Sequence, residues 1–249
     1  MSLTLINCDL SQAELRVMAL LSGDEWMIDA LQEGRGDYFD TYMMPAAFPW
    51  ILEKYESVQE YKKKDPVEHK ENRTKVKAVQ YGLAFGRQAR AIAVELGMSV
   101  READQIIKNY LNTAKGFSAW RNAVMEAAID PSKRDLLINP FGRKFQSEVI
   151  TSKNRNNIQR EALSFLPQST SSDICLTTAI RINGTLQGQG YNIFNIVHDA
   201  IMIEGEEDRA DEIGKYVAAE LRETGRMVFG DTVPFLSDYS TGKSWSDLD

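Results

Sequence analysis

The chain has 249 residues, of which 43% are hydrophobic and 26% charged, so it can bury the core of one large or two modest globular domains. No apolar stretch reaches the length of a membrane span, and the N-terminal sequence lacks the pattern of a secretory signal, so a cytosolic protein is expected. The net charge of −7 argues against a protein that simply coats nucleic acid. Cys8 and Cys175 form no metal-binding or disulfide pattern, and we predict that both are reduced core residues.

The first half of the chain is predicted to be one strand followed by helices. Residues 3–9 predict a strand that runs into a helix beginning near Ser11, and a short helix follows from Asp24 to about Gln32. The region from about 37 to 145 is mostly helical in pattern. The helices expected within it are 72–95, 99–112 and about 120–128, and a turn is expected at Pro140 and Gly142.

The second half is predicted to contain two long helices and the remaining strands. A helix is expected over 154–184 with an interruption near Pro167. YNIFNIV, HD and AIMIEG then read as a β-hairpin with the polar pair at its tip. A helix at 208–229 carries apolar residues at helical spacing, and VPFLSDYS predicts a last strand.

Two aspartates are the first candidates for chemistry. Asp9 ends an apolar run and Asp199 lies between two strand-like runs, so their carboxylates could meet on neighbouring strands of one sheet. Such a pair suits metal-assisted phosphoryl transfer. Taken singly, Asp9 is better explained as a helix cap and Asp199 as a turn residue, and only their joint occurrence with the other motifs favours the catalytic interpretation.

A second candidate is a stripe of side chains spaced four residues apart. Arg73, Lys77, Tyr81 and Phe85 would follow one face of a helix, with cations first and aromatic rings after them. That order suits a nucleoside triphosphate, because the cations would meet the phosphates while a ring packs near the sugar and base. An amphipathic helix with a basic wet side is the alternative explanation.

Two glycines in this segment favour the nucleotide-binding explanation over the amphipathic helix. Gly82 and Gly86 each cost about 1 kcal/mol inside a helix. A segment that accepts both is expected to need the close approach of a ligand or of another backbone.

These motifs resemble the family A DNA polymerases, the group that contains bacterial DNA polymerase I. The resemblance rests on CDLSQAELR at 8–16, RTKVKAVQYGLAFG at 73–86 and NIVHDAIMIE at 195–204. NPFGRKF, REALSFLPQSTSSDI and VPFLSDYSTGKSW supply further matches in the same order. The resemblance covers nearly the whole chain and implies a DNA-directed DNA polymerase acting in a bacterial or phage-infected cytoplasm.

The resemblance implies a two-metal catalytic centre. Asp9, Asp199 and the backbone carbonyl of Leu10 would hold two Mg²⁺ ions. Lys77 would donate a proton to the leaving pyrophosphate.

The resemblance also implies a site for the incoming dNTP. Its residues would be Arg73, Lys77, Tyr81, Glu14, Phe85, Leu10 and Gln12. Glu14 would be the gate that blocks a ribose 2′-hydroxyl, although Ser11 and Glu14 also fit a helix capping box. A tyrosine at position 81 implies weak exclusion of dideoxynucleotides.

Arg160, Gln168 and His198 would contact the primer-template, the latter two near the minor groove, where contacts test the shape of a base pair. Taken alone, His198 is more commonly a core or turn histidine.

Three residues depart from the family pattern. Phe85 stands where tyrosine is common, and losing its hydroxyl is expected to loosen ribonucleotide rejection by about ten- to a hundredfold at most. Ala200 replaces the glutamate that usually follows His-Asp, and two-metal chemistry is expected to survive this change. Ser164 replaces a frequent asparagine, which leaves a minor-groove contact open.

The expected fold is α+β: an antiparallel palm sheet flanked by helices, with a largely helical fingers domain inserted. We expect palm at 1–36, fingers at 37–145 and palm again at 146–249. The thumb and exonuclease-like domains of the family are not in this sequence, so a second polypeptide supplying them is expected, with a truncated chain as the alternative.

Two other functions compete with this one. A single-subunit RNA polymerase shares the palm, but Glu14 and YGLAFG argue against it. A catalytically weak or silent replication subunit is the other, and the presence of Asp9, Lys77 and Asp199 argues against it.

Overall fold

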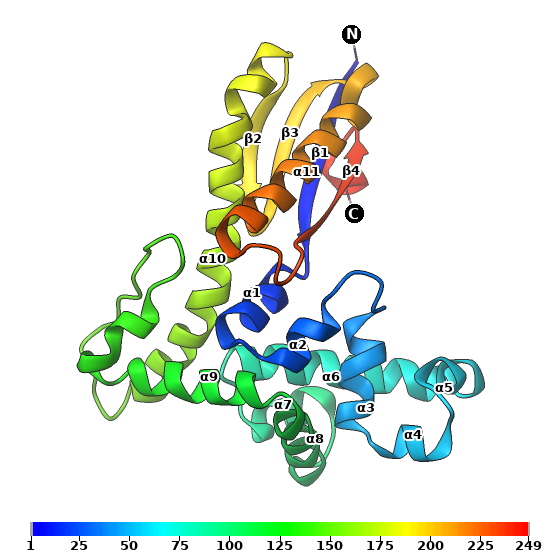
Figure 1. Cartoon of the computed structure of the whole chain (residues 1–249), viewed down its shortest axis with the longest axis vertical. Coiled ribbons are helices and arrows are strands. Elements are labelled where there is room, and N and C mark those ends of the chain that lie inside the picture. The colour runs from blue at the N-terminus through cyan, green and yellow to red at the C-terminus, as the bar shows by residue number, and fades with distance from the viewer. Residues whose placement is uncertain (1, 249) are drawn as a thin grey trace. The chain divides into compact units, whose positions relative to one another are not determined.

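The structure is a computed structural model that describes residues 2–248 and divides into two compact units (Figure 1). Unit 1 contains the chain up to Leu20, residues 139–143 and everything from Pro167 onward. Unit 2 contains residues 21–138 and 144–166. Each unit is therefore assembled from segments that are far apart in the sequence.

Helices dominate the element order, and the strands lie near the two ends of the chain. The strands are β1 (Leu3–Ser11), β2 (Asn192–Val197), β3 (Ala200–Glu206) and β4 (Leu236–Gly242). The α-helices are α1 (Ala13–Ser22), α2 (Glu25–Ala30), α3 (Met44–Ala47), α4 (Trp50–Lys54), α5 (Val58–Lys64), α6 (Pro66–Ala84), α7 (Ala89–Leu96), α8 (Val100–Thr113), α9 (Lys115–Ala127), α10 (Arg155–Gly188) and α11 (Ala210–Phe229). A π-helical turn at Phe39–Met43 and a 3₁₀ segment at Pro131–Leu137 join some of them.

The sheet of unit 1 is antiparallel throughout, in the order β2-β3-β1-β4. The predicted α+β class with an antiparallel sheet is thus confirmed, as is the hairpin, whose tip is His198 and Asp199. The first strand of the chain occupies a central position, because β1 pairs with β3 on one side and β4 on the other.

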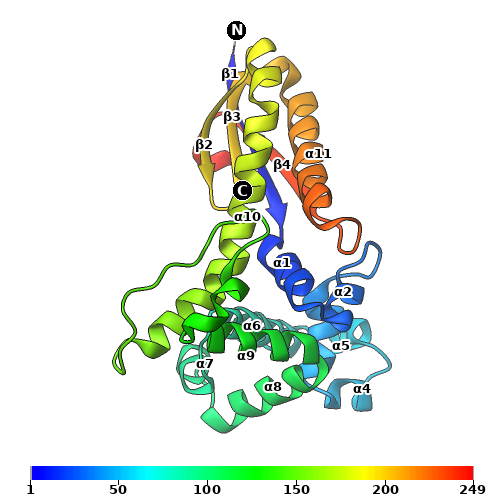
Figure 2. The same ribbon diagram turned by 60° about the vertical axis from the view of Figure 1, so that its left-hand side comes forward.

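The two faces of this sheet differ. Ile6, Cys8 and Leu10 are buried on one face, and they alternate along β1 with more exposed residues that include Asp9. Helix α11 packs on the buried face against β1 and β4, and the Cys8 Sγ lies 3.7 Å from the Gly214 carbonyl oxygen of that helix (Figures 1 and 2). Asp9 therefore points to the face that α11 does not cover.

The C-terminal half of α10 is tied to α11 by polar contacts. The Thr178 and Thr224 hydroxyls lie 2.8 Å apart, and Arg181 forms an ion pair with Glu220 at 3.0 Å. These contacts add a second helix to the layer that carries α11.

Unit 2 is helical, and Figure 2 shows α6, α7, α8 and α9 gathered in it. Asp24 joins two of its helices, because one carboxylate oxygen caps α2 at Met27 N and the other accepts from Phe117 N of α9, both at 2.9 Å. A second group of buried side chains lies around α9 and the first part of α10, including Val124, Leu137 and Leu163.

Two predicted elements differ from the structure. The helix expected over 72–95 is two helices, because α6 ends at Ala84 and Gly86 adopts a left-handed φ of 69° before α7 begins. The interruption expected near Pro167 is absent: α10 runs through it without a break. Pro167 is buried, and packing around it outweighs the backbone hydrogen bond that a proline removes.

Both cysteines are buried and free, in agreement with the prediction of reduced core residues. Over residues 2–248, no helix is both long and apolar enough to cross a membrane.

Candidate active site

Asp9 lies near the end of the central strand β1. Its direct neighbours across the sheet are Ala200 on β3 and Asp238 on β4. Directly opposed residues in an antiparallel sheet project to the same face. The three side chains therefore form a row on the face that α11 leaves open.

Asp199 is held beside β1 by its own backbone. Its carbonyl oxygen accepts a hydrogen bond from Leu10 N at 3.2 Å, which ties the hairpin tip to the residue after Asp9. His198 precedes it with a φ of 56°, and Gln12 has the same value. These are the only two non-glycine residues with positive φ in the described part of the chain, and such strain is common at functional sites.

Both carboxylates have raised pKa values, and Asp199 contributes to the shift of Asp9. Lost hydration, and then repulsion by Asp199, raise the pKa of Asp9 to about 6, against an ordinary value of 3.8. Lost hydration also raises the pKa of Asp199. A cation between the groups would relieve this repulsion, and carboxylate and carbonyl oxygens are the donors that hard divalent ions prefer. The residues present thus fit a Mg²⁺-type ion.

A cavity in unit 1 collects several of the predicted site residues. Glu14, Gln168, His198 and Asp199 line it together with Ser171, Ser172, Leu176 and Ile196. Gln168 is hydrogen-bonded to Glu14, which opposes the rise in the pKa of Glu14 caused by lost hydration and by Asp199. Glu14 therefore faces the same space as Asp199.

The capping-box explanation of Glu14 is wrong. Helix α1 begins at Ala13, and Ser11 is still part of β1. The Ser11 hydroxyl donates to Asp238 at 3.0 Å instead of capping the helix.

The predicted stripe on α6 lies in unit 2 and faces the segment 37–40. Arg73 donates to Asp40 at 2.7 Å and to Asp37 at 2.9 Å. The Lys77 Nζ lies 5.3 Å from the centre of the Phe39 ring. The stripe is therefore cationic, and its arginine is already engaged by two acids.

The aromatic end of the stripe continues one residue past the helix. Phe85 is the C-terminal cap of α6, yet its ring stacks on Tyr81 with centroids 6.4 Å apart. The two rings thus remain neighbours although the helix ends between them.

The two glycines of this motif are explained by packing. A Cβ atom on Gly82 would meet the Ile92 side chain of α7 at 2.9 Å. A Cβ on Gly86 would meet the Arg160 side chain at 2.7 Å and its Cα at 3.2 Å. The close approach expected from the sequence is therefore made by α7 and by the backbone of α10.

Arg160 also lines a cavity of unit 2 together with Gly86, Arg87, Arg90 and Gln159. Its guanidinium donates to Asn157 on its own helix. Ser164 one turn later bonds the carbonyl oxygens of Arg160 and Glu161, so its hydroxyl is used within α10.

The predicted site residues are thus shared between the units. Unit 1 carries Asp9, Leu10, Gln12, Glu14, Gln168, His198 and Asp199, and unit 2 carries Arg73, Lys77, Tyr81, Phe85 and Arg160. Sequence reasoning missed Asp238, which stands directly opposite Asp9. Only the pairing of the first strand with the last brings Asp238 to Asp9, and the sequence predicts VPFLSDYS as a strand without indicating its neighbour.

The chain belongs to DNA polymerase family A, whose family model matches residues 1–247. It is 28% identical over 244 residues to the thermostable DNA polymerase I of Thermus thermophilus, covering 97% of this chain and 27% of that protein. It is also 28% identical over 246 residues to DNA polymerase I of Streptococcus pneumoniae R6, covering 97% of this chain and 26% of that one.

A solved structure gives the same fold. The POL domain of Pol1 from M. smegmatis, in complex with DNA primer-template and dNTP, matches with a TM-score of 0.78 and 25% identity. The match covers 98% of this chain and 40% of that one. The chain spans about a quarter of the length of the curated relatives it matches.

Proposed function

We propose that this chain is the catalytic portion of a DNA-directed DNA polymerase, which adds dNTPs to a primer 3′-hydroxyl. The observation that carries the proposal is the adjacency of Asp9, near the end of the central strand, and Asp199 at the tip of the neighbouring hairpin, in a chain of family A. The structural relative bound to primer-template and dNTP supports the same assignment of substrates.

In this proposal Asp9, Asp199 and the Leu10 carbonyl hold two Mg²⁺ ions. Bound Mg²⁺ would activate the primer hydroxyl and neutralise the triphosphate and the leaving pyrophosphate. The raised pKa of Asp9 supports the assignment, because crowded carboxylates of this kind gain most from a cation.

Residues of the α6 stripe in unit 2 are proposed to bind the nucleotide. Arg73 and Lys77 hold its phosphates, Tyr81 packs near the sugar, and Lys77 supplies a proton to pyrophosphate. Glu14 excludes a 2′-hydroxyl, and Gln12 and Phe85 are the remaining residues proposed to bind the nucleotide. Because Arg73 is paired with Asp37 and Asp40, the triphosphate must replace at least one of these contacts.

The primer-template is proposed to contact Arg160, Gln168 and His198. The sheet that carries Asp9 and Asp199 is then the palm, and the helical region of about 37–145 is the fingers. Selection of the nucleotide would follow from closure of the fingers on a correct base pair.

The test is primer extension on a primed template with dNTPs and Mg²⁺. Asp199→Ala is expected to lower the rate on the order of 10³-fold, because it removes a metal ligand. Asp208→Ala, which removes an exposed acid of the same unit, is the matched control and is expected to leave the rate unchanged. Equal activity of the wild type and Asp199→Ala would contradict the proposal. Metal-independent DNA binding without extension by the wild type would favour a silent replication subunit.

A further inference from the structure

The row across the sheet contains an acid, Asp238, to which the sequence assigns no role. Asp9 is flanked by Ala200, where a glutamate is usual, and on its other side by Asp238. We propose that Asp238 is a positioning residue for the divalent ions, and that its carboxylate replaces the negative charge that Ala200 lacks. This inference rests on the proposed two-metal function.

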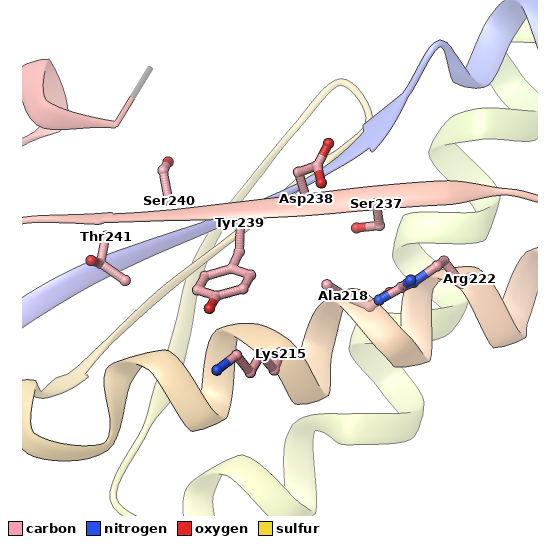
Figure 3. Close-up of a pocket in the computed structure, with 8 residues that line it drawn as sticks. All are labelled: Lys215, Ala218, Arg222, Ser237, Asp238, Tyr239, Ser240 and Thr241. Atoms are coloured by element: carbon pink, nitrogen blue, oxygen red, sulfur yellow. The ribbon is translucent and has the colours of Figure 1, made fainter. Parts of the chain in front are cut away.

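The geometry places Asp238 on the correct face of the sheet. Figure 3 shows its carboxylate on the side of β4 opposite to Tyr239, whose ring points to α11. Tyr239 is the partner of Cys8, a buried residue, and Asp238 is the partner of Asp9. Directly opposed residues have Cβ atoms about 4.5 to 5.5 Å apart.

The arrangement also carries a cost that needs an explanation. Like charges directly opposite one another destabilise a sheet. Asp238 and Asp9 are such a pair, because they face each other across β4 and β1. A bound cation would turn this repulsion into attraction, whereas a purely structural residue at this exposed position would not need a charge.

Asp238 accepts a hydrogen bond but has no Lys, Arg or His partner among the described residues. The Ser11 hydroxyl donates to its Oδ2 at 3.0 Å, and this donor sits two residues after Asp9 on the same strand face. No ion pair of Asp238 is found within residues 2–248. Its charge is therefore available to act on an ion beside Asp9.

Asp238 acts from outside the direct ligand set. In the part of the chain that the structure describes, no three Asp, Glu, His or Cys side chains converge closely enough to share one metal. Its carboxylate would therefore accept hydrogen bonds from water bound to the ion and add its negative charge from one strand away. Asparagine keeps the acceptor for Ser11 and removes only the charge.

The test is titration of the full chain with Mn²⁺, followed by electron paramagnetic resonance of the free ion, without DNA or nucleotide. Asp238→Asn is expected to weaken binding about three- to tenfold, because it removes one charge close to a divalent ion. Asp238→Glu is expected to keep the affinity within about twofold of the wild type, because it retains the charge. Glu204→Gln is the matched control, since it removes a β3 charge on the face of Ala200 but about 13 Å further along, beyond the screening length at physiological salt.

A rescue experiment separates the charge from the position. Ala200→Glu in the Asp238→Asn chain places a carboxylate on the other side of Asp9 and is expected to recover the lost affinity. Thermal unfolding without metal checks the fold, and Asp238→Asn is expected to be at least as stable as the wild type because it removes one of two directly opposed like charges.

The outcomes distinguish this inference from the proposed function. Mn²⁺ binding that Asp9→Asn abolishes, but that Asp238→Asn affects no more than Glu204→Gln, would overturn the role of Asp238 alone. Mn²⁺ binding that does not depend on Asp9 would overturn the two-metal function, and the inference with it.

Discussion

The ionised carboxylate of Asp9 destabilises the metal-free fold. Its pKa is raised to about 6 by lost hydration and by the nearby acids Asp199 and Asp238. A carboxyl group with a higher pKa in the folded state binds its proton more tightly when folded. Its ionised form therefore destabilises the metal-free fold fully above about pH 6, and this penalty disappears as the pH falls below about 4.

Asp9→Asn is thus expected to stabilise the metal-free chain in a pH-dependent way. At pH 7.5 we expect a gain of about 1 kcal/mol in the free energy of unfolding, a value reduced for the exposure of the side chain, and little gain at pH 4. Urea unfolding in the presence of EDTA at the two pH values measures the difference. Asp208→Asn serves as the control and should have no effect at either pH. A gain of equal size at both pH values would show that repulsion at Asp9 is not the cause.

Phe85 makes a different prediction at the residue scale, about substrate choice. Under the proposed function, in which Glu14 excludes a 2′-hydroxyl, a tyrosine hydroxyl at position 85 would support that exclusion, so Phe85→Tyr is expected to improve rejection of ribonucleotides by about ten- to a hundredfold at most. The ring stack on Tyr81 should persist, since the change adds only a hydroxyl. The measurement is the ratio of dNTP to rNTP incorporation. Equal ratios for the two chains would refute the prediction.

At the scale of elements, the sequence predicts what depends on local pattern. Helix α8, the hairpin and α11 follow from the local sequence pattern, and the structure confirms them. The break between α6 and α7 depends on contacts between elements, because Gly86 is needed where α10 approaches the turn. The continuity of α10 through Pro167 is likewise set by burial, which a local rule on proline does not include.

The break after α6 can be tested by substituting its glycine. Gly86→Ala must adopt a left-handed φ, which costs about 1 to 2 kcal/mol, and its Cβ also meets Arg160 on α10. With overpacking of about 1 to 3 kcal/mol added, we expect a loss of about 2 to 5 kcal/mol in the free energy of unfolding.

Gly97→Ala is the matched control for this prediction. Gly97 has a similar φ of 62°, but a Cβ there meets nothing within 4 Å, so only the conformational cost is expected. Both variants are measured by denaturant unfolding. Equal losses would show that the contact with α10 contributes nothing.

For the whole molecule, the order of motifs along the chain reveals the family but not how residues meet. Asp9 and Asp199 are 190 positions apart and become neighbours only through the pairing of β1 with β3. Asp238 joins them only through the pairing of β1 with β4, so no local pattern could have identified it. Strand order and register are global properties, and they decide which acids share a face.

The net charge of −7 is also a property of the whole molecule, and it bears on DNA binding. An acidic chain repels DNA on average, so its affinity for DNA must come from local clusters of basic side chains. The cavity of unit 2 lined by Arg87, Arg90 and Arg160 is such a place. Arg87 is paired there with Glu95, which leaves Arg90 and Arg160 as the stronger candidates for phosphate contacts.

Arg160→Ala is therefore expected to weaken binding of a primer-template by a similar factor for every sequence, because phosphate contacts carry no sequence information. It should also reduce the slope of log affinity against log salt concentration by about 1, the effect of losing one phosphate contact. Fluorescence anisotropy over a range of salt concentrations measures both effects. Arg101→Ala removes an exposed arginine of α8 that lies outside the cavity and keeps the net charge matched. If both variants lower the affinity and the slope equally, binding follows net charge alone; if only Arg160→Ala does so, a local contact overcomes the repulsion of an acidic molecule.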